Sequence, residues 1–202
     1  MKLIGSLTSP YVRKVRIVLA EKNIDHQFDV DSPWMPETQV AQVNPLSKIP
    51  VLVLDDGSVL FDSRVIVEYL DDLFPNNMLI PTVEHGRFTV KRWEAVADGI
   101  CDAAALIFLE RKRPPEQQGH DWIARQEDKI DRGLAFIAKD LGDSPWCMGE
   151  HFSLADLTVG CALGYLVFRF PQIEWQRTYA NLARLYAKLM SRPAFIETIP
   201  QG

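Results

Sequence analysis

The chain has 202 residues, of which 47% are hydrophobic and 24% are charged. These are ordinary values for a soluble globule with a sizeable core, and they exclude general disorder. The length allows one large domain or two modest ones. The formal net charge of -5 lacks the positive excess that general binding to nucleic acid or to an anionic membrane needs, so small molecules and proteins are the expected partners.

The cysteines and the apolar runs indicate a cytoplasmic setting. Cys101, Cys147 and Cys161 are widely spaced and form no CxxC pair, which argues against a disulfide framework or a zinc site. Residues 1–6 lead into no long apolar stretch, so no signal peptide is expected. The longest nearly apolar run, 157–168, is shorter than the about 18 residues that a membrane-spanning helix needs. We expect neither a metal site nor a membrane segment.

The first 75 residues alternate between the periods of strands and helices. A helix between the first two strands makes that pair parallel, and a glycine turn at Gly57 makes the last pair antiparallel. The prediction is a small mixed sheet with helices against it. The elements in chain order are a strand at 2–7, a helix at 11–22, a strand at 27–30, a short helix before Asn44, strands at 51–54 and 58–61, and a helix at 64–74.

The helix at 11–22 has a well-marked start. Ser9 is placed as its N-cap and Pro10 as its first helical residue. Its valines and Leu19 fall on one face at helical spacing. The cations of this helix are expected mainly on the opposite side, and they are Arg13, Lys14 and Arg16.

From residue 85 onward the pattern is helical almost throughout. Helices are predicted at 87–111, at 117–141, from Ser153, and at 181–190. Ser153 and Asp156 form a capping box at the start of the third helix. The expected organisation is an α/β domain at 1–76, a linker at 77–84 and an all-helical domain at 85–202.

Ser9 is the most promising polar residue for chemistry. GxGxxG, GKS/T, HExxH and GxSxG motifs are all missing, which removes the commonest nucleotide, metal and hydrolase interpretations. Ser9 stands where the first strand meets the first helix, and its hydroxyl together with the positive helix end can stabilise an anion. From its position alone, a plain N-cap is the simpler interpretation.

Four motifs in order resemble the serine-type glutathione S-transferases, and most of all their small bacterial members. The motifs are TSPYVRKVR at 8–16, NPLSKIPVL at 44–52, FDSRVI at 61–66 and FSLAD at 152–156. The resemblance covers nearly the whole chain. It implies a thioredoxin-like domain followed by a helical-bundle domain, a homodimer, and glutathione as co-substrate.

The resemblance also implies a set of site residues in the first domain. Ser9 would act on the glutathione sulfur, and Ile49 would pair its backbone with the cysteinyl part, next to a cis peptide bond before Pro50. Asp62 and Ser63 would hold the γ-glutamyl end, and Lys48 would approach the tripeptide. Each has a simpler alternative. Pro50 could merely begin a strand, Asp62 and Ser63 could only cap a helix, and Lys48 could be a solvated charge.

Two departures from the family pattern affect this assignment. Asp62 is one methylene shorter than the usual Glu, and Thr8 offers a second hydroxyl that could share the role of Ser9. The segment 1–75 holds no cysteine, which argues against a thioltransferase that works through a mixed disulfide.

The second substrate would meet a pocket of aromatic side chains. The candidates are Tyr11, Trp34, Phe108 and Tyr165, with Phe168 nearby in sequence, and each could instead belong to the core or to a domain junction. The expected activity is transfer of glutathione to a small electrophile or glutathione-dependent reduction of a peroxide. An isomerase or a dehalogenase fits the same pattern. The alternative from another class is a catalytically silent binding or regulatory protein.

Overall fold

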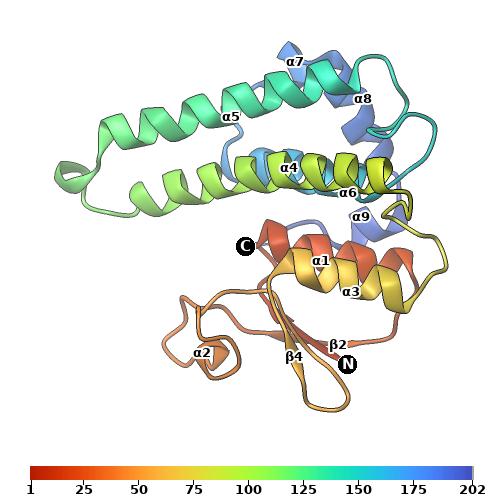
Figure 1. Ribbon diagram of the computed structural model, residues 1–202. Helices are drawn as coiled ribbons and strands as arrows, with labels where there is room; N and C mark the ends of the chain where they lie inside the picture. The colour runs from red at the N-terminus through yellow and green to blue at the C-terminus, as the bar shows by residue number, and fades with distance from the viewer. Residues whose placement is uncertain (202) are drawn as a thin grey trace. The chain divides into compact units, whose positions relative to one another are not determined.

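The structure, a computed structural model, describes residues 1–201, and of residue 84 only the backbone. They form two compact units, one of residues 1–80 with the terminal segment from 191, the other of residues 81–190 (Figure 1). The terminal segment is held to the first unit at Arg192, which donates two hydrogen bonds of 2.8 and 2.6 Å to the carboxylate of Glu21.

A four-stranded mixed sheet forms the first unit, as the sequence predicts. Its strands have the order β2-β1-β3-β4. β1 and β2 are parallel, with Leu3 opposite Phe28, whereas β3 is antiparallel to both β1 and β4. The strand bounds are β1 Lys2–Gly5, β2 Gln27–Val30, β3 Val51–Val53 and β4 Val59–Leu60.

Helices lie on both faces of this sheet. α1 (Pro10–Glu21) and α3 (Ser63–Leu73) lie side by side on one face (Figure 1). The one-turn α2 (Val40–Val43) belongs to the other face, where Val40 packs in one cluster with Ile4 and Val51. Successive strand residues point to opposite faces, so β1 and β3 are buried on both sides, as connected α/β sheets require.

α1 is buried on most of its surface. The expectation that Arg13 and Lys14 lie on an exposed face is therefore wrong. Arg13 and Lys14 are only 2% and 1% exposed. Arg13 donates 3.2 Å to the carbonyl of Phe195 and lies over the ring of that residue, at the start of the chain's last helix, α9 (Pro193–Glu197). Lys14 donates 3.1 Å to the Ser63 hydroxyl. The side that the sequence pattern left to solvent is covered by other parts of the chain.

The second unit is all-helical, as predicted. α4 and α5 run side by side in opposite directions (Figure 1), and α6 also packs on α4. Short elements of a single turn were missed, because one turn is too short to show a period. The bounds are α4 Glu84–Glu110, η1 Pro115–Gln117, α5 His120–Leu141, α6 Leu154–Arg169, α7 Trp175–Thr178 and α8 Ala180–Leu189.

The predicted capping box starts α6. The Ser153 hydroxyl accepts 3.2 Å from the amide of Ala155, and the Asp156 carboxylate accepts 2.9 Å from the amide of Ser153. α6 is buried along most of its length. Within the described part of the chain, no helix combines the length and the apolar composition that crossing a membrane takes.

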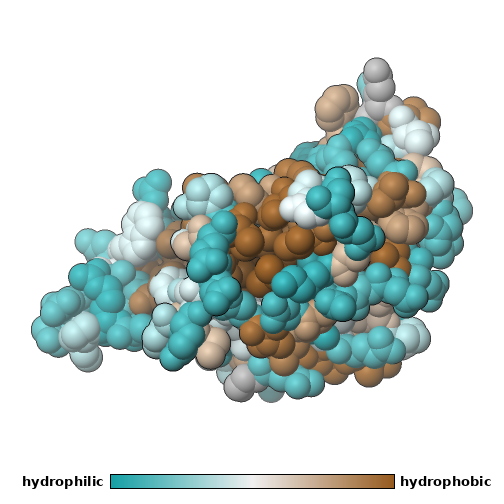
Figure 2. Space-filling model, turned by 90° about the horizontal axis from the view of Figure 1, so that it is seen from below, coloured by the Kyte–Doolittle hydropathy of each residue, from teal (hydrophilic) through white to brown (hydrophobic). Residues whose placement is uncertain are grey.

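Some large apolar side chains remain on the surface. In the first unit Trp34 is 73% exposed, and Val30, Met35 and Leu46 are also exposed. On the face drawn in Figure 2, apolar side chains gather in patches that are bordered by polar ones. Scattered exposure of this kind is normal for a folded protein, and by itself it indicates no partner.

Candidate active site

Ser9 caps α1 and keeps a hydroxyl proton to donate. Its Oγ accepts 3.3 Å from the amide of Val12, and its backbone is extended, as an N-cap requires. Accepting this bond uses an oxygen lone pair, so the O–H remains a donor, and among residues 1–201 no acceptor takes it. The side chain is half-buried. Capping and anion binding are therefore compatible at this residue.

Thr8, the neighbouring hydroxyl, has a different partner. Its Oγ1 lies 3.4 Å from the Oγ of Ser6. Thr8 is half-buried, like Ser9. Only Ser9 combines a hydroxyl with a contact to the first turn of the helix.

The peptide bond between Ile49 and Pro50 is cis, as the family resemblance implies. Pro50 is buried and directly precedes β3, Ile49 is half-buried, and the Lys48 side chain is exposed. Asn44, buried to 2% exposure, donates 2.8 Å from Nδ2 to the carbonyl of Lys48. Asn44 thus fixes the loop that presents Ile49, a role that sequence reasoning missed although the NP pair marked the position.

Asp62 and Ser63 begin α3. The carboxylate of Asp62, an exposed residue, accepts 2.8 Å from the amide of Arg64 and so caps the helix. The peptide bond before Asp62 is also cis. Ser63 is buried, and its hydroxyl accepts from Lys14. Lys14 is the second residue that sequence reasoning missed, because its burial depends on α3.

The four aromatic candidates fall into both units. Tyr11 and Trp34 belong to the first unit, where Tyr11 is half-buried. Phe108 and Tyr165 belong to the second unit, and Arg169 contacts both: its Cζ is 4.5 Å from the Phe108 ring centre, and it is hydrogen-bonded to the Tyr165 side chain. Burial raises the pKa of Tyr165, so its phenol keeps its proton at neutral pH.

Cavities and metal ligands give no competing site. Hollows of about 460 and 420 Å³ in the first unit lie along the sheet, one beside Asp55 and one beside Val40, and Ser9 lines neither. Among the side chains that the structure describes, no three of His, Cys, Asp or Glu come together as metal ligands.

A mixed four-stranded sheet, a cis-proline loop and a separate helical unit define the class of the glutathione transferases. Family models match both parts: glutathione S-transferase N-terminal domain at residues 8–73 and C-terminal domain at residues 121–188. The chain is 39% identical over 200 residues to an Escherichia coli K12 protein named "Uncharacterized GST-like protein YibF", covering 99% of this chain and 98% of the relative.

Solved structures agree over the full length. A glutathione S-transferase from Methylobacillus flagellatus with glutathione bound has a TM-score of 0.96, 50% identity and 99% coverage of both chains. One from Methylobacterium radiotolerans, in complex with glutathione sulfonate, has a TM-score of 0.96 and 42% identity, covering 100% of this chain and 95% of the other. The chain belongs to the glutathione S-transferase superfamily.

Proposed function

We propose that the protein activates glutathione with the Ser9 hydroxyl and transfers it to a small electrophile. The observation that carries this proposal is the geometry of Ser9, whose oxygen accepts from the first turn of α1 while its proton remains available to donate. Full-length likeness to structures that hold glutathione or its sulfonate supports glutathione as the co-substrate.

The chemistry follows from the acidity of a thiol. A free thiol has a pKa near 8.5, so only a few per cent is the reactive thiolate at pH 7. A hydrogen bond from Ser9 and the positive end of α1 both favour the anion. Lowering the thiol pKa by about two units takes about 2.7 kcal/mol, which two such contacts can supply together. The thiolate then forms a bond to the electrophilic carbon. In a substitution the leaving group departs with its electron pair, and in an addition the electron pair of the acceptor's double bond takes up a proton.

The rest of the tripeptide is assigned to other residues of the first unit. Ile49, ahead of the cis bond to Pro50, offers its backbone to the cysteinyl part. Asp62 and Ser63 at the start of α3 receive the γ-glutamyl end, and the exposed Lys48 approaches the tripeptide. Ser63 accepts a hydrogen bond from the buried Lys14. A cationic side chain therefore lies next to this part of the site, which suits the carboxylate of the γ-glutamyl end.

Calorimetric titration with glutathione, followed by assays against a panel of electrophiles and hydroperoxides, tests the function. Binding together with turnover supports a transferase, and the panel separates conjugation from peroxidase activity. Binding without any turnover favours a silent regulatory protein, and the absence of binding contradicts the proposal.

The family pattern also supports assembly and location. We expect a homodimer in the cytoplasm, with the glutathione-binding domain at 1–76, a linker at 77–84 and the helical domain at 85–202, whose terminal segment from 191 packs with the first domain. Sedimentation equilibrium checks the dimer, since a molecular mass equal to the 23.0 kDa of one chain contradicts it.

A further inference from the structure

Two cations of the second unit surround one aromatic ring. The Nζ of Lys112 lies 4.6 Å from the Phe108 ring centre, and the Cζ of Arg169 lies 4.5 Å from the same centre. Arg169 also lies over Phe168, at 4.2 Å. Both side chains are positively charged, so they repel each other at this short distance from one ring.

Among the described side chains, neither cation has an acidic partner. Two other stacked arginines of this unit do: Arg92, over Phe136, pairs with Asp140, and Arg111, over Phe170, pairs with Glu127 at 2.8 Å. For Lys112 and Arg169, none of the carboxylates that the structure describes lies within ion-pair distance.

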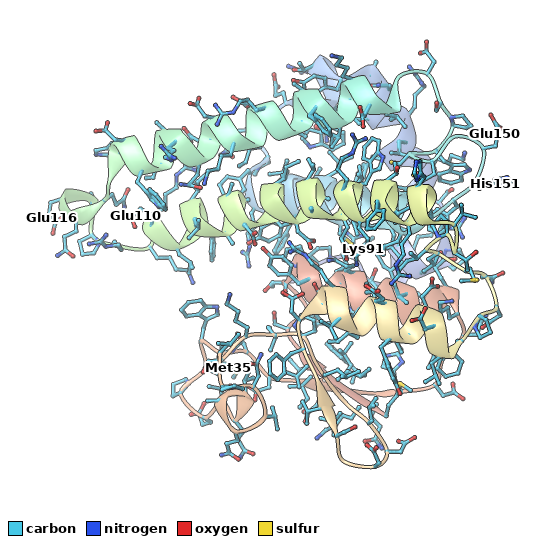
Figure 3. The ribbon with its side chains drawn as sticks, viewed as in Figure 1. Met35, Lys91, Glu110, Glu116, Glu150 and His151 are labelled. Carbon is cyan, nitrogen blue, oxygen red and sulfur yellow. The ribbon has the colours of Figure 1, made fainter. Side chains whose placement is uncertain are left out.

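Glu110 is the acid nearest to Lys112 in sequence, and it is engaged elsewhere. It lies at the end of α4 (Figure 3). Its Oε1 accepts 2.9 Å from Arg113 and 2.8 Å from the amide of Gly119. The charge of Lys112 is therefore not neutralised by its own helix end.

The helix ends explain only part of this arrangement. Lys112 follows α4 and Arg169 ends α6, and helix C-termini attract cations. That attraction does not account for the Nε of Arg169, which is buried without a hydrogen-bond partner among the described residues. A buried donor of this kind usually has an acceptor. Stacking on rings leaves a guanidinium with its in-plane N–H groups as donors, the geometry that binds a carboxylate with two parallel bonds.

We propose that Lys112 and Arg169, arranged around Phe108, bind the carboxylate of a small organic anion. The hydrogen bond with the buried Tyr165 holds the guanidinium in place. The inference goes beyond the proposed transferase function, and the ligand class it names is the small carboxylates.

Binding of benzoate and of its neutral analogue benzamide, measured by calorimetry on the full chain, tests the site without catalysis. Benzoate should bind more tightly than benzamide. Arg169→Gln should weaken benzoate binding about tenfold or more and leave benzamide unchanged. Equal binding of the two probes to the unmodified protein, or an unchanged benzoate affinity in the variant, overturns the site.

Two further variants distinguish a loss of benzoate binding from a loss of folded protein. Lys112→Gln changes an exposed side chain and should weaken benzoate binding in the same direction with an unchanged melting temperature. Arg92→Gln is the matched control, because Arg92 stacks on a ring but has its own acid, and it should leave benzoate affinity unchanged. A loss in Arg92→Gln equal to that in Lys112→Gln contradicts the assignment.

Discussion

Lys22 and Asp71 form a buried ion pair inside the first unit. The Nζ of Lys22 is 2.8 Å from Oδ1 of Asp71, with side chains 0% and 1% exposed. Lys22 also donates 2.7 Å to the carbonyl of Phe74, and Asp71 accepts 2.9 Å from the amides of both Leu79 and Ile80. The pair therefore ties the end of α1 to the segment that follows α3.

Asp71→Ala should lower the free energy of unfolding by about 3–5 kcal/mol, because it leaves the Lys22 charge buried and unpaired. Urea denaturation measures the change. Asp128→Ala is the matched control: its partner Arg132 is 3.6 Å away on one exposed helix face, and losing that pair should cost only about 0.3–0.5 kcal/mol. Similar losses in the two variants would contradict the role of the buried pair.

Phe195 anchors the last segment of the chain to the first unit. It is fully buried, and Arg13 lies over its ring with 5.6 Å between the guanidinium carbon and the ring centre. Phe195→Ala should therefore cost about 3–5 kcal/mol of unfolding free energy. Ile196→Ala, at a neighbour that is 51% exposed, should cost less than about 1 kcal/mol. Denaturant titration of both variants gives the comparison, and equal losses would disprove an anchoring role for Phe195.

Ser9→Ala should lower turnover roughly tenfold or more at pH 7 while glutathione affinity stays nearly unchanged, because fewer bound thiols are ionised. The defect should shrink toward pH 9, where the thiol ionises without help. Stopped-flow conjugation kinetics across this pH range measure it. Losing the helix cap should also cost about 1 kcal/mol of stability.

Two variants separate the hydroxyls at this position. Ser9→Thr keeps both the cap and the donor and should retain most of the turnover. Thr8→Ala should leave turnover unchanged, because the Thr8 hydroxyl lies beside Ser6. A larger loss in Thr8→Ala than in Ser9→Ala would move the chemistry to Thr8.

Cys147 should resist alkylation in the native protein. Burial raises the pKa of its thiol, and the nearby Asp156 carboxylate raises it further, so the reactive thiolate is absent at pH 8. Mass spectrometry after iodoacetamide treatment should show Cys147 unmodified until a denaturant is added. Rapid labelling of the native protein would show that this residue is accessible and ionised.

Local signals in the sequence predicted most of the helices and strands, and they predicted that Ser9 is the N-cap of α1. The cap of α1, the capping box of α6 and the glycine turn of the hairpin each depend on residues a few positions apart. The directions of two strand pairs followed from the connecting elements, since a crossover helix requires parallel strands and a tight turn requires antiparallel ones. The order of the four strands, with β1 beside β3, came only from the structure.

The burial of charged side chains was decided only by the tertiary structure. Helical spacing placed Arg13 and Lys14 on a polar face, yet Arg13 bonds to a residue 182 positions away and Lys14 to one 49 positions away. The stacking of Arg169 on Phe108 likewise depends on the packing of α6 against α4. A periodic pattern reports which residues share a face of one helix, whereas whatever covers that face comes from elsewhere in the chain.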